Sequence, residues 1–278
     1  MEKKMLGKTG ECVAAIGFGT WGIGGWETPD YSMDNKAVEA IRYAVELGMN
    51  HIDTAEFYAA GHSEELVGKA IKNFPRDDVF VATKVWHTNL RYENVIASCR
   101  KSLERLQLKY VDLYMMHWPN PRIPISETMK AMEKLVKDGL VRYIGVSNFD
   151  VPLLEEAMEA MKSEEIVSNQ VSYSLENRAI ERELLPFCEK NGITIVAYTP
   201  LGKGRLLTDR SEKGRKLEET AAKYGKTPAQ VALNWVIWKP NIITIPKALK
   251  KEHIEENAGA AGWRLSEEDY EALCRIWR

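Results

Sequence analysis

Residues 51–58, His51-Ile52-Asp53-Thr54-Ala55-Glu56-Phe57-Tyr58, leave a short apolar strand and turn into a loop. This stretch delivers a carboxyl group, Asp53, and a phenol, Tyr58. Two later apolar segments end in the same way, one in Lys84 and the other in His117. The C-terminal ends of neighbouring parallel strands share one face of a barrel, so we expect these four ionisable groups to meet there.

Short apolar segments alternate with amphipathic segments on both sides of this stretch. The apolar residues Ala37, Ile41 and Val45 recur at helical spacing, and Gly48 is a natural helix C-cap. The expected strands are residues 15–18, 50–53, 79–85, 111–116, 143–147, 168–171, 193–197 and 242–245. The expected helices are residues 34–48, 63–73, 91–106, 125–138, 152–161, 178–191, 227–238 and 251–261, with a last helix from Ser266. For the longer insert, residues 199–226, we predict neither a helix nor a strand.

Eight strand–helix units in one chain of this length predict an α/β fold, a closed (β/α)8 TIM barrel. We expect residues 1–278 to form a single domain, because no linker-like or low-complexity segment interrupts them. Residues 5–16 read as an N-terminal β-hairpin that closes the bottom of the barrel. The helix from Ser266 would be an additional C-terminal helix. A doubly wound open sheet is the alternative architecture.

Composition narrows the class of protein. The 278 residues are 45% hydrophobic with a net charge of −2, which allows a large core and gives no reason to expect nucleic-acid binding. No apolar run approaches the ~20 residues of a membrane span, and no signal peptide is apparent, so we expect a cytoplasmic protein. Scarce glutamine beside plentiful Glu and Lys suggests a thermophilic source. Nothing in the pattern distinguishes a monomer from a small homo-oligomer.

The four cysteines give no metal or disulfide signature. They are widely separated and include no Cys-x-x-Cys spacing, which favours free thiols in a reducing compartment. They are Cys12, Cys99, Cys188 and Cys274. We therefore predict no metal site.

Residues 17–22, Gly17-Phe18-Gly19-Thr20-Trp21-Gly22, match the Gly-x-Gly-x-x-Gly dinucleotide fingerprint. That fingerprint requires a helix that opens at its third glycine. Here more glycines and Pro29 follow, and no helical period begins before about Asp34. We interpret the glycines instead as residues that let the backbone pass close to a flat group, with Trp21 at the edge of that site.

The four ionisable groups together make a proton donor. A free tyrosine has a pKa of about 10, and a nearby ammonium group lowers it. Lys84 would lower the pKa of Tyr58, Asp53 would hold Lys84, and His117 would hydrogen-bond the same substrate oxygen. A site that protonates an oxygen without an activated nucleophile suits carbonyl reduction, with the hydride supplied by a cofactor.

Two later loops suit the phosphates of such a cofactor. The loops after strands seven and eight are the usual phosphate site of this barrel. After the seventh expected strand, residues 200–204 form a glycine-containing loop next to Arg205. After the eighth, the chain continues as Ile245-Pro246-Lys247.

Over almost its whole length the chain resembles an aldo-keto reductase. The motifs that carry this resemblance are Gly17-Phe18-Gly19-Thr20-Trp21, Asp53-Thr54-Ala55 with Tyr58, Thr83-Lys84-Val85-Trp86, His117-Trp118-Pro119, Gly145-Val146-Ser147-Asn148-Phe149, Asn169-Gln170, Tyr198-Thr199-Pro200-Leu201-Gly202 and Ile245-Pro246-Lys247. The resemblance implies a metal-free enzyme that uses NADP or NAD to reduce aldehydes or ketones, or to oxidise alcohols. It implies that Asp53, Tyr58, Lys84 and His117 are catalytic and that Tyr58 is the general acid.

The resemblance also implies a set of cofactor-binding residues. Ser147, Asn148 and Gln170 would bind the nicotinamide amide, and Tyr198 would stack on its ring. The full implied set is Gly19, Thr20, Trp21, Asp53, Ser147, Asn148, Gln170, Tyr198, Pro200, Leu201, Gly202, Ile245, Pro246, Lys247, Ala248, His253, Glu256 and Asn257. The expected substrate pocket is formed by Trp21, Tyr58, Trp86, His117 and Trp118.

Two positions depart from the family pattern at the adenosine end. Ala248 stands where a small hydroxyl residue is usual, and His253 stands where an arginine associated with the NADP 2′-phosphate is usual. We therefore expect both cofactors to work and NADPH to lose its usual advantage.

Two other functional classes remain open. A metal-dependent hydrolase would use His51, Asp53 and His117 as ligands. A non-catalytic barrel would bind the nicotinamide cofactor as a sensor or accessory subunit.

Overall fold

The computed structural model describes residues 1–277 and has an eight-stranded parallel sheet at its centre. The strands are β3 (Phe18–Gly19), β4 (His51–Asp53), β5 (Phe80–Val85), β6 (Val111–Met116), β7 (Val141–Ser147), β8 (Ile166–Ser172), β9 (Thr194–Tyr198) and β10 (Ile242–Thr244). They pair in sequence order, and Ile16 pairs in parallel with Thr244. That last pairing joins the first strand to the eighth, so the sheet closes into the predicted barrel rather than an open sheet.

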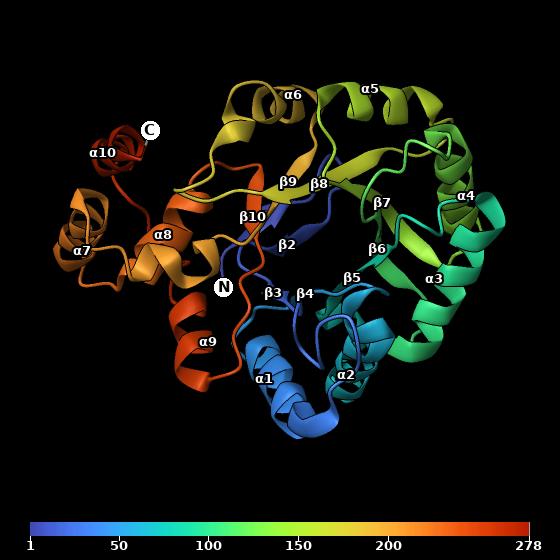
Figure 1. The fold of residues 1–278 in the computed structure, drawn as a ribbon, viewed down its shortest axis with the longest axis horizontal. Helices are drawn as coiled ribbons and strands as arrows, with labels where there is room; N and C mark the ends of the chain where they lie inside the picture. Colours follow the sequence, from blue (N-terminus) through green and yellow to red (C-terminus); the bar gives the residue numbers. More distant parts are fainter. Residues whose placement is uncertain (278) are drawn as a thin grey trace.

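Helices surround the strands as a ring (Figure 1). The helices that connect or follow the barrel strands are α1 (Asp34–Glu46), α2 (His62–Ile71), α3 (Tyr92–Leu106), α4 (Ile125–Lys137), α5 (Val151–Ala160), α6 (Leu184–Asn191), α8 (Pro228–Val236) and α9 (Lys251–Ala258). Two more helices, α7 (Glu212–Tyr224) and α10 (Glu267–Ile276), pack against each other outside this ring. The additional C-terminal helix is confirmed, with Ser266 as its N-cap.

Strand alternation decides which side chains enter the barrel. In β5, Phe80 and Ala82 belong to the apolar cluster inside the barrel, whereas Val81 and Val85 pack in the layer between the strands and the helices. Successive side chains of a strand point to opposite faces, so Lys84 continues the inward-facing series. The sequence interpretation of Lys84 as an inward-pointing lysine is confirmed.

The N-terminal hairpin pairs β1 (Lys3–Met5) with β2 (Cys12–Ala14) in antiparallel register. Leu6 and Val13 enter the apolar cluster inside the barrel. The ammonium of Lys4 donates to the carbonyl of Ile242, at 2.9 Å, and to two carbonyls just before β10. These contacts are made at the N-terminal ends of the strands, so the hairpin closes the bottom of the barrel, as predicted.

The expected first strand, residues 15–18, is divided between two neighbours. Ala15 accepts a hydrogen bond from the backbone N–H of Thr244 at 2.9 Å, while β3 itself begins at Phe18 and pairs with β4. The loop after β3 contains no α-helix. Its only helical segment is a short 3-10 turn at Tyr31–Met33, directly before α1. The rejection of the dinucleotide fingerprint is therefore confirmed.

Helix α7, in the insert between β9 and α8, has no counterpart among the helices expected from the sequence. Its buried face consists of Gly214, Leu217, Thr220 and Ala221, which contains only one large apolar side chain. A stripe with so few apolar residues, in an otherwise charged segment, offers little by which a buried helix face could be recognised in the sequence.

The expected helix over residues 178–191 was too long. The structure has a 3-10 turn at Ala179–Glu181, and α6 starts at Leu184. Pro186 explains the late start, because a proline lacks the backbone N–H that a helix interior requires and is tolerated only in the first turn. In residues 1–277, no helix has the length and apolar character needed to cross a lipid bilayer.

Candidate active site

Lys84 is a fully buried lysine at the end of β5. Its Nζ donates to Asp53 Oδ1 at 2.6 Å and to the carbonyl oxygen of Thr54 at 2.8 Å. Asp53 is itself buried, so both charges lie away from solvent. A buried charge is tolerated when it is paired and hydrogen-bonded, which this geometry provides.

Tyr58 completes the surroundings of Lys84 Nζ. The phenol oxygen lies 3.1 Å from Lys84 Nζ, and the Tyr58 side chain is almost fully buried. Asp53, Tyr58 and Lys84 therefore meet through direct hydrogen bonds, as their positions at strand ends predicted.

Burial affects the pKa of the Tyr58 phenol more than the nearby charge of Lys84 does. Burial raises the pKa of the Tyr58 phenol, and the ammonium of Lys84 lowers it by a smaller amount. The prediction that Lys84 brings this pKa below its ordinary value was therefore wrong for the net effect, although the direction of the lysine's own contribution is confirmed. Burial alone would lower the pKa of Lys84, but Asp53 and Tyr58 raise it above the ordinary value. At neutral pH the phenol keeps its proton and the lysine keeps its charge.

His117 follows β6 and lies beside Tyr58. The two rings have their centroids 5.5 Å apart at an interplanar angle of 74°. Burial, and next the charge of Lys84, hold the pKa of His117 well below its usual range, so the imidazole is neutral. Its buried Nδ1 has no hydrogen-bond partner among residues 1–277. A neutral imidazole with spare hydrogen-bonding capacity suits contact with an uncharged polar atom of a substrate.

Aromatic rings line one side of this group. Trp21 makes an edge contact with Tyr58 at 4.9 Å between centroids, and Trp86 makes one with His117 at 5.0 Å. Trp118 is 43% exposed, and no ring pair in the described part of the chain includes it. The structure thus brings four of the five predicted pocket residues together and leaves Trp118 outside the ring cluster.

Two aromatic residues of this cluster, Phe57 and Trp26, were not among the pocket residues predicted from the sequence. Phe57 stacks on Trp86 with centroids 3.8 Å apart, and Trp26 contacts Trp21 edge-on at 5.3 Å. Phe57 stands next to Tyr58 in the chain, so its position alone was a usable signal. Trp26 lies in an irregular loop, where no periodicity indicates which side chains point inward.

The turn after Tyr58 holds two alanines in the left-handed region, Ala59 with φ 50° and Ala60 with φ 52°. This conformation costs an L-residue roughly 1–2 kcal/mol, and glycine adopts it freely. Ala60 is exposed, so its methyl group contributes little packing.

Ala60→Gly is therefore expected to stabilise the protein by about 0.5–1 kcal/mol, after the greater entropy of the unfolded glycine chain is subtracted. The Tm in a calorimetric scan should rise by about 1–3 °C. Ala59→Gly is the matched control, because Ala59 is fully buried and the variant also loses a packed methyl group. A lower Tm for Ala60→Gly would contradict the strain argument.

The residues expected at the nicotinamide also meet. Tyr198 Oη donates to Asn148 Oδ1 at 2.9 Å, and Asn148 Nδ2 donates to the hydroxyl of Ser147 at 2.9 Å and to the carbonyl of His117 at 3.1 Å. Gln170 Nε2 donates to Asp53 Oδ2 at 2.7 Å. One hydrogen-bonded group therefore joins the expected amide-binding residues to the predicted catalytic residues.

The residues expected at the far end of the cofactor lie in two loops. In the loop after β9, Gly202 has φ 58° and begins a short 3-10 turn, Gly202–Leu207. Gly19 donates through its backbone N–H to the carbonyl of Pro246 at 3.2 Å. The loop after β3 therefore runs beside the loop after β10. Lys247 is exposed and Ala248 is buried.

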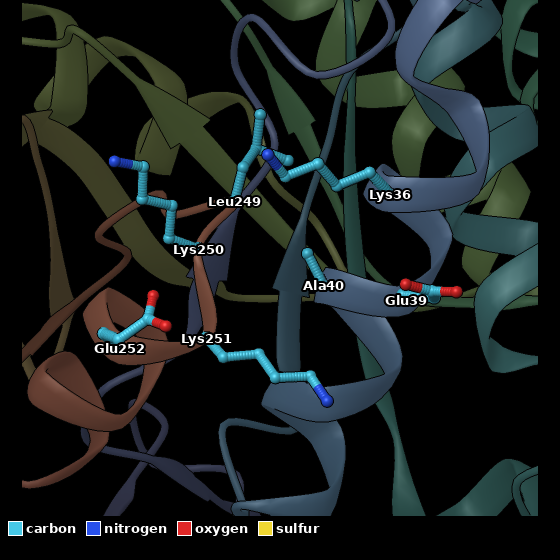
Figure 2. A pocket seen from close by; sticks show the side chains of 7 residues that line it. All are labelled: Lys36, Glu39, Ala40, Leu249, Lys250, Lys251 and Glu252. Atoms are coloured by element: carbon cyan, nitrogen blue, oxygen red, sulfur yellow. The ribbon is translucent and has the colours of Figure 1, made fainter.

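The adenosine-end residues lie on α9. His253 is exposed, and its Nδ1 lies 3.4 Å from Glu256 Oε2, while Asn257 is buried. A cleft of about 270 Å³ separates this helix from α1. Figure 2 shows Lys36 reaching from α1 toward Leu249 across it. The lining residues, which give the cleft a net positive charge, are Lys36, Glu39, Ala40, Leu249, Lys250, Lys251 and Glu252.

Residues 15–278 match the model of the Aldo/keto reductase family. The chain belongs to the aldo/keto reductase family. It is 36% identical to methylglyoxal reductase YeaE of Escherichia coli strain K12, over 100% of this chain and 96% of that protein. It is 40% identical to glyoxal reductase of Bacillus subtilis strain 168, over 86% of this chain and 83% of that protein.

Solved aldo/keto reductases have the same fold. The thermostable aldo-keto reductase Tm1743, in complex with the inhibitor epalrestat, shares 52% identity at a TM-score of 0.95, with 99% of this chain and 100% of that chain covered. An aldo/keto reductase from Klebsiella pneumoniae in complex with NADP and acetate shares 37% identity at a TM-score of 0.89, covering 100% and 96%.

As an aldo/keto reductase, the chain is an oxidoreductase that reduces carbonyl groups with a nicotinamide cofactor. The thermostable neighbour agrees with the thermophilic character suggested by composition. The comparisons support neither the metal-dependent hydrolase nor the non-catalytic barrel. Within residues 1–277, no group of three or more His, Cys, Asp or Glu side chains is placed to hold a metal ion.

Proposed function

We propose that Tyr58 is the general acid that protonates the carbonyl oxygen of small aldehydes and ketones, and that Lys84, Asp53 and His117 assist it. The observation that carries this proposal is the 3.1 Å contact between Lys84 Nζ and a phenol whose pKa burial has raised. A protonated phenol can donate to the oxygen, and the ammonium stabilises the phenolate that remains. Alcohol oxidation is the same path in reverse.

The other two residues hold and orient. Asp53 accepts from Lys84 and keeps the ammonium beside the phenol. His117, as a neutral imidazole, donates a hydrogen bond to the carbonyl oxygen and fixes it near Tyr58 Oη. The bound nicotinamide cofactor supplies the hydride.

The hydrogen-bonding groups present fit a nicotinamide. A carboxamide needs both donors and acceptors. The oxygens of the Ser147 hydroxyl and the Asn148 amide have lone pairs left to accept from it, while their own O–H and N–H groups already donate within the protein. Gln170 uses one N–H of its side-chain amide on Asp53, which leaves its second N–H to donate to the carboxamide and its side-chain oxygen to accept from it. Tyr198 presents an aromatic ring beside them. Pro200, Leu201 and Gly202 would border the pyrophosphate, and Lys247 would attract a phosphate.

We further propose that short 2-oxoaldehydes are substrates, because the relatives at 36% and 40% identity are a methylglyoxal reductase and a glyoxal reductase. The test is the oxidation of NADPH and of NADH by the purified protein with a panel of 2-oxoaldehydes, ketones and alcohols. Absence of turnover with every member of the panel and both cofactors would contradict the proposed function.

We expect both NADP and NAD to serve, with little preference for NADPH. His253→Arg should strengthen NADPH binding about 10-fold or more, as expected when a hydrogen bond to a charged group worth roughly 1.5–3 kcal/mol is added. Fluorescence titration of wild type and variant measures both dissociation constants. NADH is the internal control, because it lacks the 2′-phosphate and its affinity should hardly change. A wild-type preference for NADPH of about 100-fold or more would contradict this prediction, because Lys247 alone offers one point charge.

We also propose that residues 1–278 act as one domain, in the cytoplasm, as a monomer or small homo-oligomer. Its partners would be small carbonyl or alcohol substrates, and we expect no nucleic-acid or membrane partner.

A further inference from the structure

Glu56 ties two loops of the site together. Its Oε1 accepts the backbone N–H of Trp86 at 2.6 Å and the side-chain NH2 of Asn89 at 3.0 Å. Its own backbone N–H donates to the carbonyl of Lys84 at 3.3 Å. Glu56 stands two residues before Tyr58, so the loop that carries the phenol is fixed to the loop that carries Trp86.

The rings repeat this connection. Phe57 stacks on Trp86 with centroids 3.8 Å apart and planes 10° apart, and it lies nearly parallel to Trp21 at 6.2 Å. Trp86 in turn makes the edge contact with His117 at 5.0 Å. The distance between the Trp86 ring and the polar atoms of Tyr58 and His117 therefore depends on where the backbone of Trp86 is held.

A second hydrogen bond holds the far side of the same loop. Asn120 Nδ2 donates to the carbonyl of His87 at 2.9 Å. Without Glu56, this bond would still anchor the loop at His87. The Trp86 N–H would lose its acceptor, and the indole would be free to shift relative to His117. The expected effect is a displaced ring in a folded site, not a disordered loop.

We propose that Glu56 is a positioning residue that sets the Trp86 ring against the bound substrate and thereby favours carbonyl compounds with a flat aromatic substituent. The inference rests on the proposed function, because the carbonyl oxygen must lie between Tyr58 and His117. The substituent then extends toward Trp86. Offset or edge contacts between aromatic rings depend on distance and angle, so a displaced indole weakens them. A substituent as small as a methyl group depends on them far less.

Two 2-oxoaldehydes that differ only in this substituent provide the test: phenylglyoxal and methylglyoxal, with NADPH. Glu56→Ala should raise the KM for phenylglyoxal about 3- to 10-fold, which is the range of an aromatic pair contact converted to affinity. The KM for methylglyoxal and both kcat values should stay within about 2-fold, because the variant leaves Tyr58 and Lys84 in place. Glu56→Gln retains the oxygen acceptor and should restore the wild-type KM.

Asn89→Ala removes one of the two donors to Glu56 and should have the wild-type KM ratio for the two substrates, because the Trp86 N–H keeps its acceptor. It also keeps the proposal testable if Glu56→Ala fails to fold: a large, phenylglyoxal-specific rise in KM in Asn89→Ala would contradict the assigned role of the Trp86 bond. Glu46→Ala, at an exposed position on α1, is the matched control for loss of a glutamate.

Binding of benzoate and acetate, followed by tryptophan fluorescence, separates this inference from the proposed function. Glu56→Ala should weaken benzoate binding about 3- to 10-fold and leave acetate binding unchanged. A wild type that binds benzoate but reduces neither aldehyde would contradict the proposed function and still test Glu56. Equal changes for the phenyl and methyl compounds, or no change in either, would overturn the positioning role.

Discussion

Tyr58→Phe is expected to lower kcat/KM for carbonyl reduction by at least about 100-fold, the lower range for loss of a general acid. The substitution removes one oxygen atom and leaves the ring contacts with Trp21 and His117. Cofactor affinity should stay within about 2-fold, since the lost hydroxyl contacts Lys84 and the substrate oxygen and is not one of the groups expected to hold the cofactor. Steady-state kinetics and a fluorescence titration of cofactor measure the two effects separately.

Tyr110→Phe is the matched control for this variant. Tyr110 is located just before β6, at the opposite end of the barrel strand that leads to His117, and its hydroxyl is 3.4 Å from Asp77. It should retain wild-type kcat/KM. Turnover near the wild-type rate in Tyr58→Phe would remove Tyr58 from its proposed role.

Lys84→Met is expected to reduce kcat by about 1,000-fold, because several effects coincide. The phenol loses the charge that stabilises its phenolate, so the pKa of Tyr58 rises further and proton donation becomes less favourable. The alkaline limb of the pH–rate profile should move to higher pH. Asp53 would also remain buried without its cation, a change that typically destabilises a protein by about 3–5 kcal/mol.

The double variant Lys84→Met with Asp53→Asn separates chemistry from stability. It removes the unpaired carboxylate, so thermal stability should largely recover while activity stays low. Asp53→Asn alone should cost less activity than Lys84→Met, because the ammonium stays beside the phenol. An unchanged pH–rate profile in Lys84→Met would show that Lys84 and Tyr58 are not coupled.

The predicted catalytic residues were identifiable because strand periodicity is a strong constraint. Phe80, Ala82 and Lys84 alternate along β5, so the sequence alone places the lysine on the inward face. Neighbouring strands then bring Asp53 within 2.6 Å of it. Register in a parallel barrel leaves few other arrangements.

Other features of the fold and of the site could not be predicted, because the spacing of residues along the sequence does not determine them. The net pKa of Tyr58 results from burial competing with a nearby charge, and burial cannot be measured along a sequence. Helix α7 places Leu217, the one large apolar residue of its buried face, among charged residues. The bonds from Glu56 to Trp86 and Asn89 join loops, where neither helical nor strand periodicity applies.

The hairpin at the bottom of the barrel has a consequence for how this enzyme can change. Leu6, Val13 and Lys4 secure the strands at their N-terminal ends, the base of the barrel, whereas the upper loops, which carry Tyr58, Trp86 and His117, follow the C-terminal ends of the strands. Heritable variation in the upper loops can therefore alter which compounds are accepted without weakening the base. Laboratory mutagenesis for new substrates is best confined to those loops, and the N-terminal hairpin within residues 1–14 is best left unchanged.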